Sequence, residues 1–281
     1  MSYGPNPWQQ AHWDWRAAGN FVCGGAGAGL LVFAAFGGAG GGARAALLLL
    51  GLALVGAGLT CVWLEIGRPL RALHVFFNPR TSWMSREAFT AALLFPAGLA
   101  GAAGFAPAAW AAGLLALAFL FCQARILRAA RGIPAWRQPG IVPLVVSTGL
   151  AEGCGLYLML QPLHGQGGQV LMAVFAGLLA ARWANWVSYR RRLASSAARP
   201  ALAALDQAGD RLQRVGTYLP FALIAPVGIG LASGAFGLLL AAAAGAAAAW
   251  PGAVLKHTLI TRAGFNQGFA LTAMPVRGAR L

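Results

Sequence analysis

The chain has 281 residues, of which 59% are hydrophobic and only 10% are charged, and its mean hydropathy is +0.66. A soluble domain usually carries about 25% charged residues, so this composition excludes an ordinary soluble protein and predicts an all-α polytopic membrane protein. The net charge of +15 is dispersed over short connections between apolar segments. Since these charges form no single basic domain, they argue against nucleic-acid binding.

The apolar segments are long enough for eight membrane-spanning helices, each of which needs about 20 residues. We expect these helices at residues 18–37, 45–66, 87–105, 107–128, 140–163, 168–190, 217–234 and 236–256. Gly and Ala dominate them, and small residues let helices approach closely, so residues 1–281 should form one tight bundle. The Trp-containing residues 1–17 are expected at the membrane surface, and residues 257–281 form a tail outside it.

Positive charge is distributed unevenly over the two sides of this predicted bundle. Of the 21 Lys and Arg residues, nineteen fall on, or within about one helical turn of, the N-terminus, the connections 67–86, 129–139 and 191–216, and the C-terminus. The other two are Arg44, in an odd-numbered connection, and Arg182, inside a span. Cytoplasmic loops collect Lys and Arg. We therefore expect a multi-pass protein of the bacterial inner membrane with both termini in the cytoplasm.

The connection at residues 67–86, together with its flanks, is rich in groups that can carry chemistry. It sets four arginines and two glutamates, Glu65 and Glu87, at one boundary of the membrane. Glu87 is expected in the first turn of the third span, where the helix dipole favours an anion, so a structural role explains it. Alternatively, this group of charges docks a protein, or polarises and protonates a ligand held between the helices.

The start of the first span offers a second set of candidate residues. His12, Arg16 and Asn20 are spaced four apart, which places them on one face if the helix begins near residue 9, as we expect. Gly24 and Gly27 continue roughly that face and are expected to leave room for a flat ring. His can exchange protons near neutral pH. The alternative is an ordinary interfacial helix start, with the Arg16 side chain reaching to the headgroups.

Two charged residues are expected deep in the membrane. Glu152 is the only one of the six acids at that depth, and Arg182 lies at a similar depth in the next span. Charges there are costly unless they are paired. Because the fifth and sixth spans form a tight antiparallel hairpin, the sequence predicts a Glu152–Arg182 pair. Such a pair would either lock the bundle or belong to a proton path.

No metal site is expected in this chain. The four cysteines occur singly and no C-x-x-C is present, which argues against an iron–sulfur cluster or a zinc site. None of the four histidines lies in the middle of a predicted span, so a pair of axial haem ligands is not expected.

One stretch of the chain resembles a known family. Glu65-x-Gly-Arg-Pro-Leu-Arg, followed by Pro-Arg-Thr-Ser-Trp-Met-Ser-Arg-Glu87, resembles the signature of the polysulfide reductase-type membrane anchors, which include the dimethyl sulfoxide reductase anchors. The Gly-rich first span, the count of eight spans and a C-terminal Pro-x-Arg-Gly extend this resemblance. The N-terminal Gly-Pro-Asn-Pro-Trp-Gln-Gln-Ala-His-Trp-Asp-Trp-Arg resembles a narrower group, the membrane subunits of phenylacetyl-CoA:acceptor oxidoreductases.

The resemblance implies partners and cofactors. Family members anchor a ferredoxin-like subunit with [4Fe–4S] clusters and a molybdopterin catalytic subunit, and they bind quinone without haem. Arg71 and Glu87 match an Arg and a Glu that are linked to quinol function in the family. The family's His position is Glu65 here, which leaves open which group handles the proton.

We therefore expect the chain to pass electrons between a cytoplasmic iron–sulfur subunit and ubiquinone or menaquinone. The quinone would lie near the residues His12, Arg16, Asn20, Glu65, Arg71 and Glu87. The complex would oxidise an acyl-CoA such as phenylacetyl-CoA, and a cytoplasmic sulfite-oxidising complex is the alternative. Two other classes stay open, a purely structural anchor and a membrane transporter. Pro143 and Pro226 interrupt spans, as in transporters, but no inverted repeat is visible.

Overall fold

The structure is a computed structural model that describes residues 6–66, 69–165 and 168–268. Within these ranges the chain is all-helical, and the only β pairing is one isolated bridge between Gln9 and Phe265. Parts of several predicted features lie outside the described residues. These are positions 1–5 of the N-terminal segment, Gly67 and Arg68 of the motif, and the tail from residue 269, with its Pro-x-Arg-Gly.

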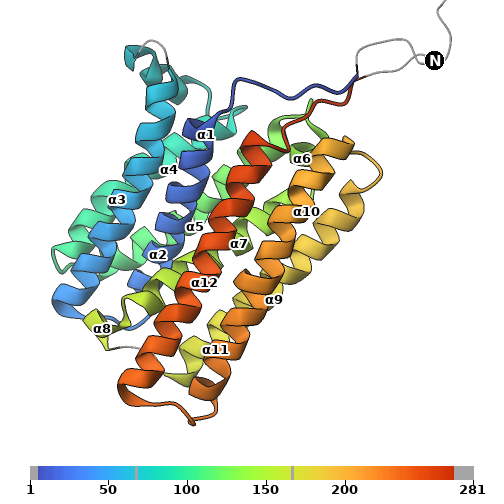
Figure 1. The fold of residues 1–281 in the computed structure, drawn as a ribbon. Coiled ribbons are helices and arrows are strands. Elements are labelled where there is room, and N and C mark those ends of the chain that lie inside the picture. Colours follow the sequence, from blue (N-terminus) through green and yellow to red (C-terminus); the bar gives the residue numbers. More distant parts are fainter. Residues whose placement is uncertain (1–5, 67–68, 166–167, 269–281) are drawn as a thin grey trace, which may run out of the picture.

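The helices run side by side as a bundle (Figure 1). In chain order they are α1 (Trp15–Gly19), η1 (Asn20–Gly24), α2 (Gly25–Phe36), α3 (Gly41–Glu65), η2 (Pro69–Phe77), α4 (Trp83–Ala102), α5 (Ala106–Ala129), α6 (Pro134–Arg137), α7 (Ile141–Met159), α8 (Gln161–His164), α9 (Gln169–Leu193), α10 (Arg199–Gln213), η3 (Arg214–Tyr218), α11 (Leu219–Gly228) and α12 (Gly234–Thr261). The elements η1 and η3 are π-helical turns, and η2 is a 3₁₀ helix.

The prediction of a multi-pass helical membrane protein is confirmed. Six helical segments of the described chain are long and apolar enough to cross a membrane: Trp15–Phe36, Gly41–Glu65, Ala106–Ala129, Ile141–Met159, Gln169–Leu193 and Gly234–Thr261. The first of these is continuous through α1, η1 and α2. The remaining two predicted spans coincide with α4 and with α11, which are outside this set of six.

The predicted connection at 191–216 is wrong in its extent. Most of it is helix α10, which continues through η3 into α11 without a break. Apolar residues recur in α10 at helical spacing, and Leu205 and Leu212 are fully buried. Its other face carries Asp206 and Asp210. This polar face lowers the mean hydropathy of the segment, so a search for apolar runs does not find an amphipathic helix.

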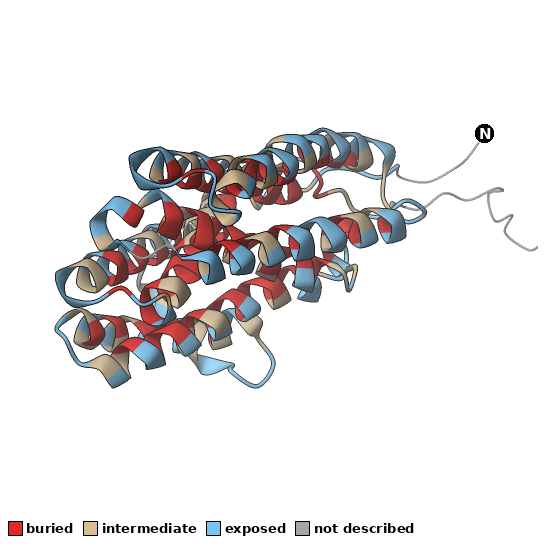
Figure 2. Cartoon of the chain, turned by 90° about the horizontal axis from the view of Figure 1, so that it is seen from below, coloured by how far each residue is buried: buried red, intermediate tan, exposed pale blue. Residues whose placement is uncertain are grey.

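Helix α7 lies in the centre of the bundle, and close backbone approaches hold it there. A Cβ atom added to Gly153 would lie 2.0 Å from the carbonyl carbon of Gly29 in α2. On α12, a Cβ added to Gly245 would lie 2.2 Å from the carbonyl oxygen of Gly155. Small residues at these crossings increase van der Waals contact, which drives helix association in lipid. Buried residues accordingly face the space between helices, and exposed ones face outward (Figure 2).

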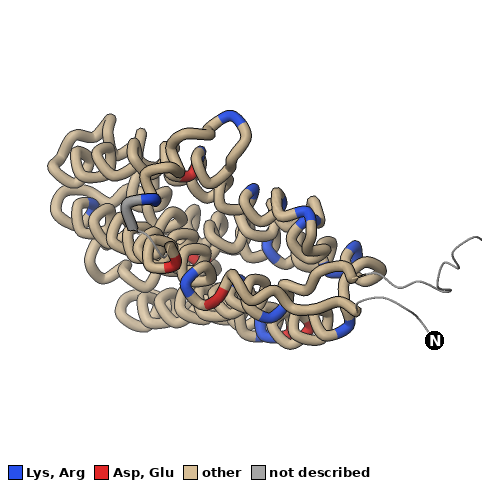
Figure 3. The backbone as a smooth tube through the Cα atoms, turned by 90° about the horizontal axis from the view of Figure 1, so that it is seen from above, with Lys and Arg blue, Asp and Glu red and all other residues tan. Residues whose placement is uncertain are grey.

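The first and last described segments pair with each other at one end of the bundle (Figure 1). The Trp8 amide donates to Asn266 Oδ1 at 2.9 Å, and the Gln10 amide donates to the Gly264 carbonyl at 2.8 Å. Seen from above, this molecule displays many more Lys and Arg residues than Asp and Glu residues (Figure 3). Because the two segments pair, both described ends of the chain lie on the same side of the bundle.

Candidate functional site

Two adjoining pockets lie at this end of the bundle, between α3, α4 and the start of the first span. The larger has a volume of about 370 Å³ and reaches from α3 to η2, and the smaller, of about 260 Å³, extends to α1 and η1. Both are lined mainly by apolar side chains. They share the lining residues Val62, Ile66, Met84 and Glu87. An apolar hollow with a few polar groups is typical of a small-molecule site.

Glu87 is the polar residue common to both pockets. Ser82 caps α4 by accepting a hydrogen bond from the Ser85 amide at 3.3 Å, which sets Glu87 one turn inside the helix rather than in its first turn. The Glu87 side chain is buried, and its Oε1 accepts a hydrogen bond from Asn20 Nδ2 at 3.3 Å. No Lys or Arg of the described chain forms an ion pair with it. A carboxyl group with amide partners can either accept or donate a proton at the wall of the pocket.

Asn20 connects Glu87 to a third helix. It opens the π-helical turn η1, a type of distortion that is frequent at functional sites. Gln123 of α5, which is fully buried, donates from Nε2 to the Asn20 backbone carbonyl at 2.9 Å and to Asn20 Oδ1 at 3.3 Å. Asn20 is therefore held from one side and presents its amide to Glu87 on the other. We call Glu87, Asn20 and Gln123 the pocket cluster.

Glu65, the last residue of α3, lines the smaller pocket together with Trp13. The N-terminal segment is tied to the same place, because Arg16 donates to the Leu64 carbonyl at 3.0 Å and pairs with Asp14 at 2.9 Å. Hydrogen bonds from Arg16 hold the pKa of the partly exposed Asp14 carboxyl group below its usual value. Arg16 thus fastens the start of the first span to the end of α3, beside the pocket.

The remaining candidates from the sequence lie outside the pockets. His12 is exposed and precedes the helix, because α1 begins only at Trp15, so the expected helix face shared with Arg16 and Asn20 is wrong for His12. Arg71 is exposed on η2, where only its backbone carbonyl has a described contact, with His74 Nδ1 at 3.2 Å. The structure thus brings together Asn20, Glu65 and Glu87, and it leaves the His12 and Arg71 side chains at the rim or beyond.

The expectation that Gly24 and Gly27 leave room for a ring is wrong. A Cβ atom added to Gly24 would lie 2.7 Å from Gln123 Nε2, and one added to Gly27 would lie 2.7 Å from the Gly51 carbonyl oxygen. Neighbouring helices therefore fill the space that a side chain would occupy at each glycine, and no open space is left for a ring. These glycines let the first span pack against α5 and α3.

The predicted Glu152–Arg182 pair is also wrong, because Glu152 pairs with Lys256 of α12 at 2.5 Å, and both side chains are only 1% exposed. Arg182 donates instead to two backbone carbonyls, that of Ala248 at 2.8 Å and that of Gly216 in η3. The last span was predicted to end at residue 256, so the charge of Lys256 was assigned to the C-terminal side of the membrane. Helix α12 in fact continues to Thr261, so Lys256 lies one turn inside the bundle.

Glu152, Lys256 and Arg182 form a second group of buried polar residues, which we call the core cluster. Lys256 Nζ also donates to the Val22 carbonyl of η1 at 3.3 Å, so this cluster reaches the helix that carries Asn20. A Cβ added to Gly25 would lie 2.8 Å from Lys256 Nζ and 3.4 Å from Gln123 Oε1. One glycine therefore separates the core cluster from the pocket cluster.

Gln123 and Lys256 are the site residues that sequence reasoning missed. Gln123 had a usable signal, since it is an uncharged polar residue in an apolar span, and such residues tend to face the bundle interior. No group of three or more His, Cys, Asp or Glu that could hold a metal ion occurs within residues 6–66, 69–165 and 168–268. Comparison of the chain with protein-family models and with curated proteins finds no match.

Proposed function

We propose that this chain is the quinone-reacting membrane anchor subunit of a molybdopterin and iron–sulfur oxidoreductase, of the polysulfide reductase-type anchor family. The observation that carries the proposal is the buried Glu87 carboxyl group, which lies in the wall of two apolar pockets and accepts a hydrogen bond from Asn20. The motif that resembles the family ends on this same residue. Two separate arguments, one from sequence and one from geometry, therefore support Glu87.

The pocket residues fit the chemistry of a quinone. A quinone is a flat apolar ring with two opposed carbonyl oxygens, and its reduction to a quinol takes up two electrons and two protons. Val62, Ile66 and Met84 supply apolar walls that exclude water. We propose that Glu87 exchanges a proton with one ring oxygen and that Asn20 positions the Glu87 carboxyl group. Glu65, at the outer end of the smaller pocket, would exchange protons with the aqueous side.

The finer topology belongs to the same proposal. We propose that α4 and α11 complete eight crossings and that both termini face the cytoplasm of a bacterium. The excess of Lys and Arg at the connections on one side supports this orientation. A ferredoxin-like subunit docked there would lie beside the pockets, so electrons would have a short path to the quinone. A C-terminal reporter active only in the periplasm would contradict this topology.

For the substrate, we propose an acyl-CoA such as phenylacetyl-CoA, oxidised by the molybdopterin subunit. The N-terminal resemblance supports this substrate, and a coenzyme A thioester made in the cytoplasm requires an inward-facing enzyme. Assay of the purified complex with phenylacetyl-CoA and with sulfite as donors tests it. Electron transfer driven by sulfite but not by phenylacetyl-CoA would identify sulfite as the substrate and leave the anchor role intact. Co-purification with iron-containing subunits separates both readings from a transporter, which would not bind such subunits.

The decisive experiment compares two electron acceptors in the purified complex carrying Glu87→Gln. Quinone-analogue reduction should fall by about 10²-fold or more, the usual size of a general acid–base contribution. Transfer to a soluble artificial acceptor should persist, because it bypasses this subunit. Asp206→Asn is the matched control, since Asp206 is an acid outside the pockets, paired with Arg190. If both activities of Glu87→Gln fell together, Glu87 would be structural, and if neither fell, the quinone would bind elsewhere.

A further inference from the structure

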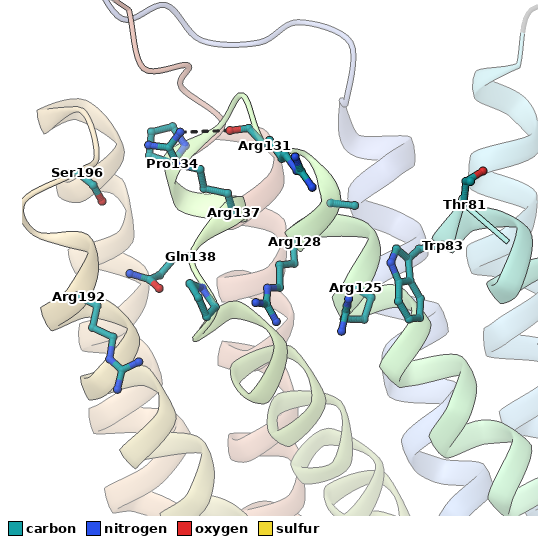
Figure 4. Close-up of a pocket in the computed structure, with 12 residues that line it drawn as sticks. Thr81, Trp83, Arg125, Arg128, Arg131, Pro134, Arg137, Gln138, Arg192 and Ser196 are labelled. Carbon is teal, nitrogen blue, oxygen red and sulfur yellow. Dashed lines mark hydrogen bonds between the residues drawn. The ribbon is translucent and has the colours of Figure 1, made fainter. Parts of the chain in front are cut away.

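A third pocket, unrelated to the pocket cluster, is surrounded by arginines (Figure 4). It has a volume of about 800 Å³ and lies where α5 and α9 end, next to α6 and the start of α7. Five arginines line it: Arg125, Arg128, Arg131, Arg137 and Arg192. Four of them lie within residues 125–137, at the end of α5, in the α5–α6 connection and in α6, and the fold adds Arg192 from the end of α9.

The positive charge of this pocket is not balanced by the protein. All six acids of the chain lie within the described residues, and none lines the pocket. Four of the acids pair with Arg16, Arg190, Arg214 and Lys256. The other two, Glu65 and Glu87, belong to the apolar pockets. Five like charges around one hollow repel one another, and an anion with more than one negative charge would relieve that repulsion.

The pocket lies at the depth of lipid headgroups. Arg125 and Arg128 belong to the end of α5 and Arg192 to the last turn of α9, and both helices are long and apolar enough to span a membrane. Trp83 also lines the pocket, and the guanidinium carbons of Arg86 and Arg125 lie 4.1 Å and 4.3 Å from the centroid of its ring. Trp is enriched at the membrane–water interface. Basic pockets between membrane helices at this level suit phosphate-bearing lipid headgroups.

A groove continues from the arginine pocket along α9. A hollow of about 390 Å³ shares Arg192 with it and is lined by residues spaced along one face of α9. Val187 and Trp183 lie on this face, roughly one and a half and two and a half helical turns inward from Arg192. Trp183, Ala184 and Val187 give the inner part of this groove the apolar surface that an acyl chain requires, while Ser188, Arg191 and Arg192 line its outer part.

We propose that this pocket binds a diphosphate phospholipid of the cardiolipin type, with its headgroup among the arginines and an acyl chain along α9. The volume is too large for one phosphate group, and arginines on separate helices can each bind a different phosphate in a bidentate manner. An acidic partner protein would be attracted by the same charge. The groove along α9 favours a lipid, because a partner on the cytoplasmic face does not reach into the bilayer.

The experiment uses the purified full-length chain, delipidated in detergent, and measures thermal stabilisation and affinity for added cardiolipin. Phosphatidylcholine and pyrophosphate are the comparison ligands. Removal of two guanidinium groups in Arg128→Gln/Arg192→Gln should weaken cardiolipin binding by roughly tenfold or more. The matched control is Arg199→Gln/Arg211→Gln, which removes two exposed arginines of α10 from outside the pocket. This control should bind cardiolipin like the wild type.

The outcomes separate the possible sources of phosphate. Equal weakening in both double variants would overturn the proposal, because it would reduce the effect to net charge. Binding of pyrophosphate without cardiolipin would overturn the lipid assignment, as would a pocket variant that binds cardiolipin normally but loses an acidic partner subunit. The single variant Arg192→Gln, on an exposed residue, gives a second measurement should the double variant fold poorly, and it should weaken cardiolipin binding by several-fold.

Discussion

The pocket cluster and the core cluster are both groups of buried polar side chains in one bundle, yet they are built differently. Glu87 has the amide of Asn20 as its hydrogen-bond partner and lies in the wall of two pockets. Glu152 has a charged partner, Lys256, and lines neither of those pockets. The charge of the enclosed Glu152 is therefore compensated by Lys256. Glu87 has no cationic partner among the described residues, so its carboxyl group in the pocket wall keeps its capacity for proton exchange.

This difference has a consequence for the deep charges. Charges at mid-membrane depth are generally functional candidates, and that rule alone would rank Glu152 above Glu87. The geometry reverses this ranking, because Glu152 and Lys256 satisfy each other while Glu87 faces a ligand-sized hollow. The two clusters are nevertheless separated by a single glycine, Gly25. Whether they act separately is therefore a question that substitutions can answer.

The largest effect is expected from Lys256→Met, which leaves Glu152 buried without a cation. Removal of one partner of a buried ion pair costs about 3–5 kcal/mol of stability, because the remaining charge loses its compensation. The double variant Lys256→Met/Glu152→Leu should recover most of this loss, since neither charge is then present. Thermal unfolding in detergent measures both. A double variant no more stable than the single variant would show that Lys256 stabilises the bundle in some other way.

The same double variant tests whether the clusters are independent. If the core cluster only stabilises the bundle, the stable double variant should keep wild-type quinone-linked turnover. A large fall in quinone-linked turnover, with electron transfer to the soluble acceptor intact, would instead show that the two clusters belong to one proton path through Gln123.

A smaller effect is expected from Asn20→Ala, which removes the link between Glu87 and Gln123. Loss of this link leaves buried polar groups without partners, which costs about 1–3 kcal/mol and corresponds to roughly 5- to 150-fold in quinone-linked turnover. Because Asn20 positions Glu87, the loss should appear mainly in kcat, and Asn20→Asp or Asn20→Gln should show whether the amide itself is needed. Asn185→Ala is the matched control, because Asn185 bonds to Pro143 and Ser147, away from the pockets. Equal effects at both asparagines would contradict a positioning role.

Much of the fold could be predicted from the sequence, because hydropathy and small-residue content report directly on burial in lipid. The helix α10 escaped prediction because only one of its faces is apolar. The burial of Lys256 was not predicted, because a charged residue near the end of an apolar run cannot be distinguished, from sequence alone, from a residue of the tail. Its burial depends on α7 bringing Glu152 opposite, and this is a tertiary contact between residues 104 positions apart.

The candidate site was predicted in part for a similar reason. Spacing along the first span correctly grouped Asn20 and Arg16 near the end of α3, since a helix fixes which residues share a face. It wrongly included His12, because the helix begins only at Trp15. The same spacing misjudged Gly24 and Gly27, because a glycine signals close approach without saying whether a ligand or another helix approaches. In this bundle the neighbours are α5 and α3.

The smallest effect is expected from Arg71→Gln, and it tests the family resemblance against the geometry. The resemblance links Arg71 to quinol function, but its side chain is exposed on η2 and does not line either pocket, although its neighbours Ala72 and Leu73 line the larger one. A substitution at such an exposed position usually changes free energies by no more than about 0.5 kcal/mol, so quinone-linked turnover should stay within about twofold of the wild type. Turnover is measured in the purified complex beside Arg80→Gln, an exposed arginine of the same connection. A fall of tenfold or more at Arg71 alone would mean that η2 moves inward when quinone binds, since only then could this guanidinium reach a ring held at Glu87.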